Sequence, residues 1–406
     1  MRTIFQINVT SNWGSHGKIA EDIGRLAIEK GWRSVIAYGR YATPSQSETI
    51  KIGSDISVKE HVLESRLMDN HGLASRSATR RLIKQIDDIK PDIIHLHNIH
   101  GYYLNYPLLF DYLKSAGVPV VWTLHDCWPF TGHCAYFDYA KCEKWEIGCC
   151  APCPCKNEYP KTILFEATKR NYQLKKEIFN TIDNLTLVPV SDWLGGLLQE
   201  SFLKKHPVHV IKNGIDINVF KPTDSVDVRK KYGIDEQPYL IGVASVWEKR
   251  KGFDDFLKLA KEMPQGMRMV LVGLDKEKLS TANQNGIVGI PRTENVGELT
   301  ALYSGAEMFL NLTYEDNYPT TNLEAMACGT PVLTYRTGGS PEAVSSETGW
   351  VVEKDDLKAV KDIIISLPQK NETMRVACRK RAEEIFDKNK CFEEYMKLYE
   401  SLIQES

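Results

Sequence analysis

Short apolar segments alternate with longer amphipathic segments along the chain, and this alternation constrains the fold more than any other feature. Residues 3–9 have the spacing of a strand, residues 18–30 that of a helix, and residues 34–38 that of a second strand. Further apolar runs lie at residues 92–97, 118–124, 186–190, 239–244, 269–272, 308–312 and 332–335. The alternation predicts an α/β fold of parallel sheets covered by helices, with ligands bound beyond the carboxyl ends of the strands.

This series of strands and helices occurs twice. A segment with turn-forming residues, 213–222, separates the two series, and a chain of 406 residues is too long for one hydrophobic core. We therefore expect two Rossmann-like domains, residues 1–216 and 217–388, that face each other across a cleft. The last segment, 389–406, has an apolar stripe, so we expect it to form a helix that returns to the N-terminal domain.

The charge and the hydropathy of the chain exclude several classes of function. The formal net charge is -2, which gives no overall field to attract nucleic acid. No stretch approaches the ~20 consecutive apolar residues that span a bilayer. Residues 1–10 alternate like a strand and lack the apolar core of a signal peptide. We expect a cytoplasmic protein whose membrane contact is at most peripheral, at the inner face of the cell membrane.

One predicted helix carries a basic face that bears on possible membrane contact. Its members are Arg76, Arg80, Arg81 and Lys84. Such a face is most often solvated helix surface. The alternative is attraction to anionic lipid, which would suit an acceptor carried on a membrane lipid.

The segment 315–324, with the sequence EDNYPTTNLE, is the most informative stretch of the chain. It connects a predicted strand to a predicted helix. The carboxylate of Glu324, at the start of that helix, can accept hydrogen bonds from the vicinal hydroxyls of a ribose. The free N–H groups of the loop and the helix dipole favour a phosphate. The pattern therefore indicates a site for a nucleotide.

This segment, with the following AMACGTPVLTYRTGGSPE, resembles the retaining glycosyltransferases of family 4, which have the GT-B fold. Their signature is a pair of carboxylates separated by seven residues, as Asp316 and Glu324 are. The resemblance implies that Glu324 binds the ribose and that Asp316 holds hydroxyls of the donor sugar. Backbone N–H groups near Thr320 and Thr321 would meet the sugar or its phosphate. The family usually has Glu at the first position, so Glu315 is an alternative to Asp316.

A basic segment after the predicted strand 239–244 resembles the part of the family that grips the diphosphate. Lys251 matches the family lysine. The preceding family arginine is absent, and Arg250 or Lys249 is the candidate to replace it. Cations here would stabilise charge on the departing nucleotide diphosphate. Arg292 follows the turn where the family tends to hold the base.

The N-terminal half offers a glycine-containing turn and a histidine that follows a strand. Gly14 and Gly17 would let backbone N–H groups approach a phosphate, although a tight turn explains them equally well. His125 comes directly after the predicted strand 118–124, where the family often has a histidine. We expect it to contact the donor sugar or its phosphate. The other nearby histidines, His95, His97 and His100, are expected to be buried and hydrogen-bonded, not metal ligands.

The resemblance implies retaining transfer of a sugar from a nucleotide-diphosphate sugar to a glycan or lipid-linked saccharide, in polysaccharide biosynthesis. No cofactor is required for that chemistry. The N-terminal domain would face the acceptor and the C-terminal domain would bind the donor. Three alternatives remain: a nucleotide-sugar epimerase of the same fold, a glycan phosphorylase, for which the chain offers no recognised lysine motif for a pyridoxal cofactor, and a non-catalytic protein that binds nucleotide sugars.

Six of the ten cysteines lie between residues 134 and 155. A tetrahedral zinc site formed by Cys134, Cys142, Cys150 and Cys153 would staple this loop without taking part in the chemistry. His133 is an alternative ligand. Free thiols and disulfides explain the cluster as well, since the spacing alone does not separate the three.

Overall fold

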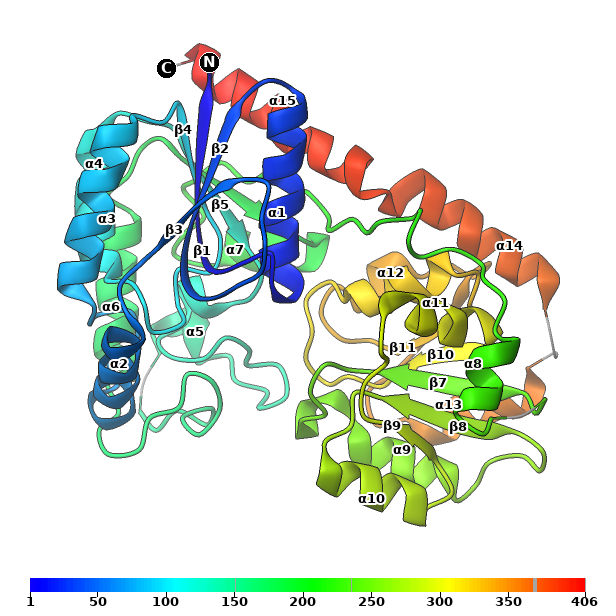
Figure 1. The fold of residues 1–406 in the computed structure, drawn as a ribbon. Coiled ribbons are helices and arrows are strands. Elements are labelled where there is room, and N and C mark those ends of the chain that lie inside the picture. Colours follow the sequence, from blue (N-terminus) through cyan, green and yellow to red (C-terminus); the bar gives the residue numbers. More distant parts are fainter. Residues whose placement is uncertain (150, 235, 368–370, 406) are drawn as a thin grey trace. The chain divides into compact units, whose positions relative to one another are not determined.

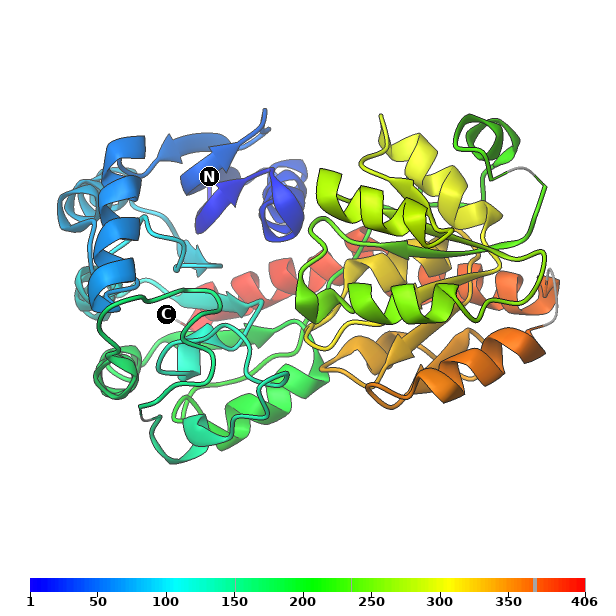
Figure 2. The same ribbon diagram turned by 90° about the horizontal axis from the view of Figure 1, so that it is seen from below.

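The computed structural model describes residues 1–406 except 150, 235, 368–370 and 406. The chain forms two compact units. Unit 1 consists of Met1–Lys212 and Phe392–Ser406, and unit 2 of Asn213–Cys391. The predicted domain limits lay within a few residues of these, at 216 and 388. Each unit contains a six-stranded sheet with helices on both of its faces (Figure 1; Figure 2).

The sheet of unit 1 is parallel throughout and has the strand order β3-β2-β1-β4-β5-β6. Its strands are β1 (Thr3–Ser11), β2 (Arg33–Ala42), β3 (Glu48–Lys51), β4 (Ile93–Leu96), β5 (Val120–Leu124) and β6 (Leu185–Pro189). The central strands β1, β4 and β5 are buried along their whole length. Burial on both faces explains why these strands are continuous apolar runs in the sequence.

Helices cover both faces of this sheet. The helices of unit 1 are α1 (Gly14–Glu29), α2 (Asp55–Met68), α3 (Arg76–Ile89), α4 (Tyr106–Ala116), α5 (Lys144–Ile147), α6 (Thr168–Phe179) and α7 (Asp192–Glu200). Apolar side chains of α3, α4 and α6 pack with those of β1, β4 and β5 in one core. Figure 1 shows α1 on the opposite side of the sheet from α3 and α4.

The C-terminal helix α15 (Lys388–Glu405) returns to unit 1, as predicted. The hydroxyl of Tyr395 lies 2.9 Å from the hydroxyl of Thr123 on β5, and the hydroxyl of Tyr399 lies 2.7 Å from Nδ1 of His95 on β4. All four side chains are buried. Because these contacts join residues about 300 positions apart, α15 is an integral part of the first unit and not a tail.

Unit 2 contains a second parallel sheet, with the order β12-β11-β10-β7-β8-β9. Its strands are β7 (Tyr239–Val243), β8 (Arg268–Val272), β9 (Val288–Ile290), β10 (Met308–Asn311), β11 (Val332–Tyr335) and β12 (Gly349–Val352). The two sheets therefore repeat one architecture, which confirms the predicted pair of Rossmann-like halves.

The helices of unit 2 also cover both sides of their sheet. They are α8 (Val226–Lys231), α9 (Phe253–Ala260), α10 (Lys276–Gln284), α11 (Val296–Gly305), α12 (Thr320–Ala327), α13 (Leu357–Ser366) and α14 (Glu372–Arg381). Apolar side chains of α9, α10 and α13 share a core with the strands, and Figure 1 shows α11 and α12 on the other face. In the described part of the chain, no helix is both long and apolar enough to cross a membrane.

Three strands were not predicted, and all are short. β3 has the sequence ETIK and is mostly exposed, and β9 and β12 are three and four residues long. Each lies at an edge of its sheet, where only one neighbouring strand and little apolar burial are needed. In addition, α1 begins at Gly14, four residues before the predicted start, because the glycine-containing turn is itself helical.

Gly273, just after β8, should be essential for the stability of unit 2. Its φ is +97°, and a Cβ there would lie 1.7 Å from the carbonyl oxygen of Ala244. Gly286 has a similar φ of +77° with nothing near its Cβ position, so it is the matched control. We expect Gly273→Ala to lower the free energy of unfolding by roughly 3 kcal/mol and Gly286→Ala by about 1 kcal/mol. Chemical denaturation measures both, and equal losses would contradict the close approach.

Candidate functional site

The N-terminus of α12 follows β10 through a loop whose residues are largely buried. The helix begins at Thr320, and Pro319 before it offers no side-chain cap. The first turn of α12 therefore presents backbone N–H groups that no capping side chain satisfies. Thr320 and Thr321, the two predicted donor-binding residues here, are both partly exposed. A helix start of this kind favours an anion such as a phosphate.

A buried polar network fixes the position of this helix start. Oδ1 of Asn322 accepts a hydrogen bond from Nδ2 of Asn311 at 2.7 Å, and Nδ2 of Asn322 donates to Oγ of Ser340 at 2.9 Å. Ser340 in turn lies 2.6 Å from the hydroxyl of Thr334 on β11. Asn322 and Ser340 are fully buried. The network ties α12 to β10 and β11, so the N–H groups have a defined direction.

Glu324 is the fifth residue of α12, about one turn after the helix start. One of its carboxylate oxygens accepts a hydrogen bond from the hydroxyl of Tyr303 at 3.2 Å. Tyr303 is completely buried on α11, and burial, reinforced by the Glu324 charge, raises its pKa well above the ordinary value. The tyrosine thus stays protonated and holds the carboxylate, while Glu324 itself remains partly exposed.

Lys251 and Asp316 form an ion pair across two neighbouring strand ends. Nζ of Lys251 lies 2.5 Å from Oδ2 of Asp316. Lys251 follows β7 and Asp316 follows β10, and these two strands are adjacent and parallel. The side chains are 22% and 17% exposed, so the pair is mostly buried but still reached by solvent. The sequence had predicted separate ligand contacts for these two residues and not their contact with each other.

Arg250 supports the loop that carries the two candidate carboxylates. Nη1 of Arg250 donates to the backbone oxygen of Glu315 at 3.2 Å, and its own carbonyl accepts from the N–H of Tyr314 at 2.7 Å. Its Nε also pairs with Glu248 at 2.9 Å. The side chain of Glu315 is buried, whereas Asp316 is partly exposed. Asp316 is therefore the better placed of the two to meet a ligand.

The remaining predicted residue of unit 2, Arg292, is exposed and lies two positions after the end of β9. β9 is the edge strand beyond β8, whereas Lys251 and Asp316 follow the central strands β7 and β10. The structure therefore groups Lys251, Asp316, Arg250 and the start of α12 after the central strands. Arg292 lies instead after the outermost strand, β9.

In unit 1, the glycine-containing turn forms the first turn of α1. Gly14 has φ of +68°, and a Cβ on Gly17 would lie 2.5 Å from the Thr10 hydroxyl. The positive φ of Gly14 and the close packing of Gly17 therefore explain on local structural grounds why glycine stands at each position. His16 lies between them and had no predicted role. Its Nδ1 is 3.1 Å from Oδ1 of Asn8, and its ring centroid is 6.0 Å from that of His125.

His125 lies directly after β5 and stacks on a second histidine. Its ring is 5.7 Å from the ring of His97, and Nε2 of His125 lies 3.4 Å from Nδ1 of His97. Burial lowers the pKa of His125 well below the ordinary value, and the neighbouring His97 and His16 lower it further. His125 is therefore neutral at neutral pH and can donate or accept a hydrogen bond, but it is a poor general acid.

The other histidines on and after β4 are buried and hydrogen-bonded, as expected. Nε2 of His95 lies 2.8 Å from the Thr123 hydroxyl, and Nε2 of His97 lies 3.0 Å from Oε1 of Gln6. His100 pairs with Asp126 at 2.9 Å. Burial raises the pKa of Asp126, but His100 and the N–H of Trp128 outweigh that effect and hold the pKa below its ordinary value.

The cysteine-rich loop brings several thiols together. Cys134, Cys153 and Cys155 form one buried cluster, and Cys134, Cys142, Cys149 and Cys153 line the same pocket. Cys155 was not in the predicted zinc set. The described cysteines form no disulfide.

The predicted zinc set can be compared with the structure only in part. Cys150 lies outside the described residues. Within the described ranges, no group of three His, Cys, Asp or Glu side chains is placed to hold a metal ion. Nδ1 of His133, the predicted alternative ligand, is instead 2.8 Å from Oδ1 of Asp69, and both side chains are buried.

Comparisons with known families cover most of the chain. Residues 17–219 match the model of Glycosyltransferase Family 4, and residues 224–385 match that of Glycosyl transferases group 1. The chain is 24% identical, over 427 aligned residues, to the putative colanic acid biosynthesis glycosyl transferase WcaC of Escherichia coli K12. That alignment covers 98% of this chain and 100% of the relative.

Solved structures share the fold over the whole chain. Sucrose-phosphate synthase from Thermosynechococcus elongatus superposes with a TM-score of 0.74 at 17% identity, covering 100% of both chains. Anabaena Alr3699/HepE in complex with UDP gives a TM-score of 0.68 at 15% identity, covering 99% of this chain and 100% of that one. At these identities the likeness establishes the fold, which is GT-B.

The buried histidines of unit 1 should make the stability of the protein depend on pH. Burial lowers the pKa of His95 and His97, and lowers that of His16 to about 4, from the ordinary 6.5. Their contribution is complete above the unfolded pKa and is lost as the pH falls toward the folded pKa. Each adds a slope of about 1.4 kcal/mol per pH unit in that window.

Urea denaturation between about pH 7 and pH 5 measures this dependence. We expect the free energy of unfolding to fall as the pH is lowered, with a smaller slope in His97→Gln. His209 is exposed, so His209→Gln should keep the slope of the unmodified protein. A stability that does not change over this range would contradict the burial of neutral histidines.

Proposed function

The chain belongs to glycosyltransferase family 4, and from that premise we propose that it transfers a sugar from a nucleotide-diphosphate sugar to an acceptor hydroxyl with retention of anomeric configuration. The acceptor we propose is a glycan or a lipid-linked saccharide in polysaccharide biosynthesis. The observation that carries this proposal is the Lys251–Asp316 ion pair beside the uncapped start of α12. The UDP in the similar Anabaena structure supports a nucleotide-sugar donor.

In this proposal the start of α12 binds the donor's phosphate and ribose. The N–H groups of Thr320 and Thr321 would donate to a phosphate oxygen, where the helix dipole also favours negative charge. Glu324 would accept hydrogen bonds from the two ribose hydroxyls. Tyr303 supports this role because its hydroxyl occupies one carboxylate oxygen and limits the rotation of the side chain.

The Lys251–Asp316 ion pair suggests how the charges of these two side chains would be used when the donor binds. Without ligand, Lys251 and Asp316 neutralise each other at 2.5 Å. A bound donor would offer Lys251 a diphosphate and offer Asp316 the sugar hydroxyls. Lys251 would then stabilise the negative charge that grows on the leaving diphosphate, which is the main electrostatic requirement of the reaction. Arg250 would assist, since it is held against the same loop.

In unit 1 the proposed ligand-binding residues are His125 and the Gly14–Gly17 turn. Because the pKa of His125 is well below neutrality, we assign it a hydrogen bond to the donor sugar or its phosphate and not a proton transfer. The acceptor hydroxyl would attack the anomeric carbon from the face of the leaving group, and a phosphate oxygen would take its proton. The protein then acts through positioning and charge stabilisation, with no nucleophile of its own.

Removing the Lys251 charge should slow transfer. We expect Lys251→Met to lower kcat by about 10²–10³-fold, comparable to the loss of one stabilising group at a developing charge. Lys258 is a matched control, because it also pairs with a carboxylate of unit 2, Asp255, at 3.2 Å. Lys258→Met should retain activity. Equal losses in the two variants, or none in Lys251→Met, would contradict the proposed role.

Incubation with donor alone separates the proposal from its alternatives. A transferase consumes the donor at full rate only with acceptor present, whereas an epimerase converts it without one. A non-catalytic protein would bind the donor but would not convert it, with or without acceptor. The anomeric proton of the transferred sugar, observed by NMR, reports retention directly, and an inverted product would refute the proposed stereochemistry.

We also propose that the thiols of the 134–155 segment bind a structural zinc ion. Although the described side chains alone do not form a ligand set, the clustering of Cys134, Cys153 and Cys155 favours such a site, and so does Lys175. Nζ of Lys175 is buried and donates to the carbonyls of Trp128 and Thr131, and burial lowers its pKa to about 7. Zinc-bound thiolates would supply the negative charge that this buried amine lacks in its immediate contacts.

Metal analysis of protein purified without added zinc should find about one zinc per chain. Cys153→Ser should remove it. Cys391→Ser, at the far end of the chain from the segment 134–155, should not. Folded protein without metal would refute the site, and thiol titration would then distinguish free thiols from disulfides.

A further inference from the structure

Three consecutive apolar side chains protrude from the surface of unit 1. Ile163, Leu164 and Phe165 are 60%, 66% and 60% exposed. Single exposed apolar residues are ordinary, but a contiguous group on a protein surface usually marks an interaction site. The group lies in the segment between the cysteine-rich loop and α6.

The protruding turn is held firmly against the end of α2. The N–H groups of Ile163 and Phe165 donate to the carbonyls of Arg66 and Leu67, at 2.7 and 3.1 Å. Within the turn, the hydroxyl of Thr162 donates to the carbonyl of Phe165 at 2.7 Å. These bonds use only backbone atoms of Ile163 and Phe165, so they do not depend on the apolar side chains themselves.

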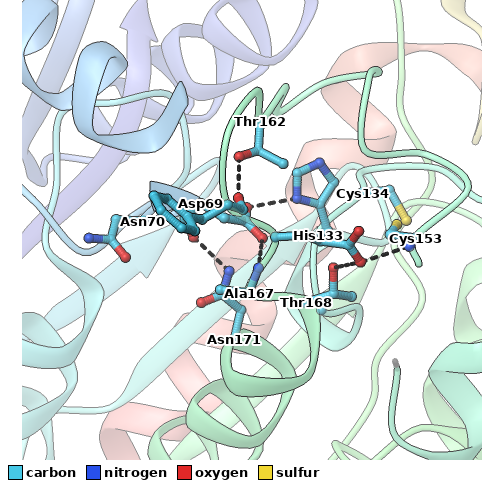
Figure 3. A network of polar contacts seen from close by, with 12 residues as sticks. Asp69, Asn70, His133, Cys134, Cys153, Thr162, Ala167, Thr168 and Asn171 are labelled. Atoms are coloured by element: carbon cyan, nitrogen blue, oxygen red, sulfur yellow. Dashed lines mark hydrogen bonds and ion pairs between the residues drawn. The ribbon is translucent and has the colours of Figure 1, made fainter. Parts of the chain in front are cut away.

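Figure 3 shows the buried network that anchors the C-terminal end of the same turn. Oδ2 of Asp69, the residue that ends α2, accepts from the N–H of Ala167 at 2.8 Å, and its backbone carbonyl accepts from Nδ2 of Asn171 at 2.7 Å. The other carboxylate oxygen of Asp69 meets His133. Asp69 is 1% exposed. The turn therefore cannot withdraw its apolar side chains without breaking buried hydrogen bonds.

The end of α2 adds apolar surface beside the turn. Leu63 is 60% exposed and lies one helical turn before Leu67, one of the two residues that bind the turn. Met68 is 44% exposed and is next to Leu67. We call the group Leu63, Met68, Ile163, Leu164 and Phe165 the apolar ridge.

Basic side chains flank the ridge. Lys161 and Lys169 are exposed on either side of the turn, and Lys59 is exposed one turn before Leu63. Glu60 is exposed near Lys59, whereas Glu166 is engaged by the N–H of Cys153 and the hydroxyl of Thr168. Lysine is depleted in protein–protein interfaces, whereas protruding apolar side chains with lysines at their base are typical of binding to an anionic membrane surface.

We propose that the apolar ridge inserts into the surface of an anionic lipid bilayer. Ile163, Leu164 and Phe165 would enter the boundary between headgroups and acyl chains, and the flanking lysines would meet the headgroups. The inference rests on the proposed function in one respect, because a lipid-linked acceptor gives the enzyme a reason to lie on a membrane. The surface itself is argued from exposure, backbone anchoring and charge.

Vesicle flotation of the full-length protein tests this without donor or acceptor. The probes are vesicles of phosphatidylcholine alone and vesicles that also contain phosphatidylglycerol. We expect binding to the anionic vesicles, weakened by salt. The triple variant Ile163→Ser, Leu164→Ser, Phe165→Ser keeps the backbone hydrogen bonds and should bind at least about tenfold more weakly. Ile365→Ser, at a residue of unit 2 that is also 60% exposed, is the matched control and should bind normally.

Three results would overturn the proposal: no binding to either vesicle, equal binding by the triple variant, or self-association of the unmodified protein that the triple variant abolishes without any vesicle binding. The last would make the ridge a protein interface. Folding of the triple variant is checked by its thermal transition. Its activity on a water-soluble acceptor reports separately on the transferase function, so failure of the membrane inference and failure of the proposed function are distinguishable.

Discussion

In a parallel sheet the carboxyl ends of all strands lie at the same end of the sheet. This constraint decides which side chains can meet in each unit. In unit 2, Lys251 and Asp316 are 65 residues apart in sequence, yet they form an ion pair because β7 and β10 are neighbours. The start of α12 comes to the same end of the sheet because one loop joins it to the carboxyl end of β10. In unit 1, His125 follows β5 and His97 follows β4, and adjacent strands stack their rings. The chemistry of each half thus depends on strand order before it depends on any single residue.

The second constraint is that polar groups gathered at a buried edge must satisfy one another. Asn322 and Ser340 hold α12 through hydrogen bonds, and Tyr303 holds Glu324. In unit 1 the histidines use Gln6, Thr123 and Tyr399 as partners. A buried polar group without a partner is costly, so these networks hold the side chains at the carboxyl ends of the strands in one arrangement. That arrangement suits a ligand whose charges appear during reaction, since the protein groups need not reorganise.

Much of the fold follows from the sequence, because fully buried strands such as β1 and β10 appear as apolar runs. The edge strands β3, β9 and β12 do not, since one-sided pairing needs little burial. Among the candidate site residues, Lys251, Asp316 and Glu324 were found through their motif. The Lys251–Asp316 contact was not, because it depends on the order β10-β7, which periodicity does not encode. Tyr303 and Asn322 carry no local signal, and the protruding turn at Ile163 depends on backbone contacts with α2 that no spacing reveals.

Donor binding at α12 is the central claim, and calorimetric titration with UDP, GDP, ADP and their common sugar conjugates tests it most directly. We expect one nucleotide series to bind selectively. We also expect Glu324→Ala to abolish this binding while the thermal transition of the ligand-free protein stays nearly unchanged, because Glu324 is partly exposed and its removal opens no apolar cavity. Undiminished binding by the Glu324→Ala variant would contradict the donor site proposed here.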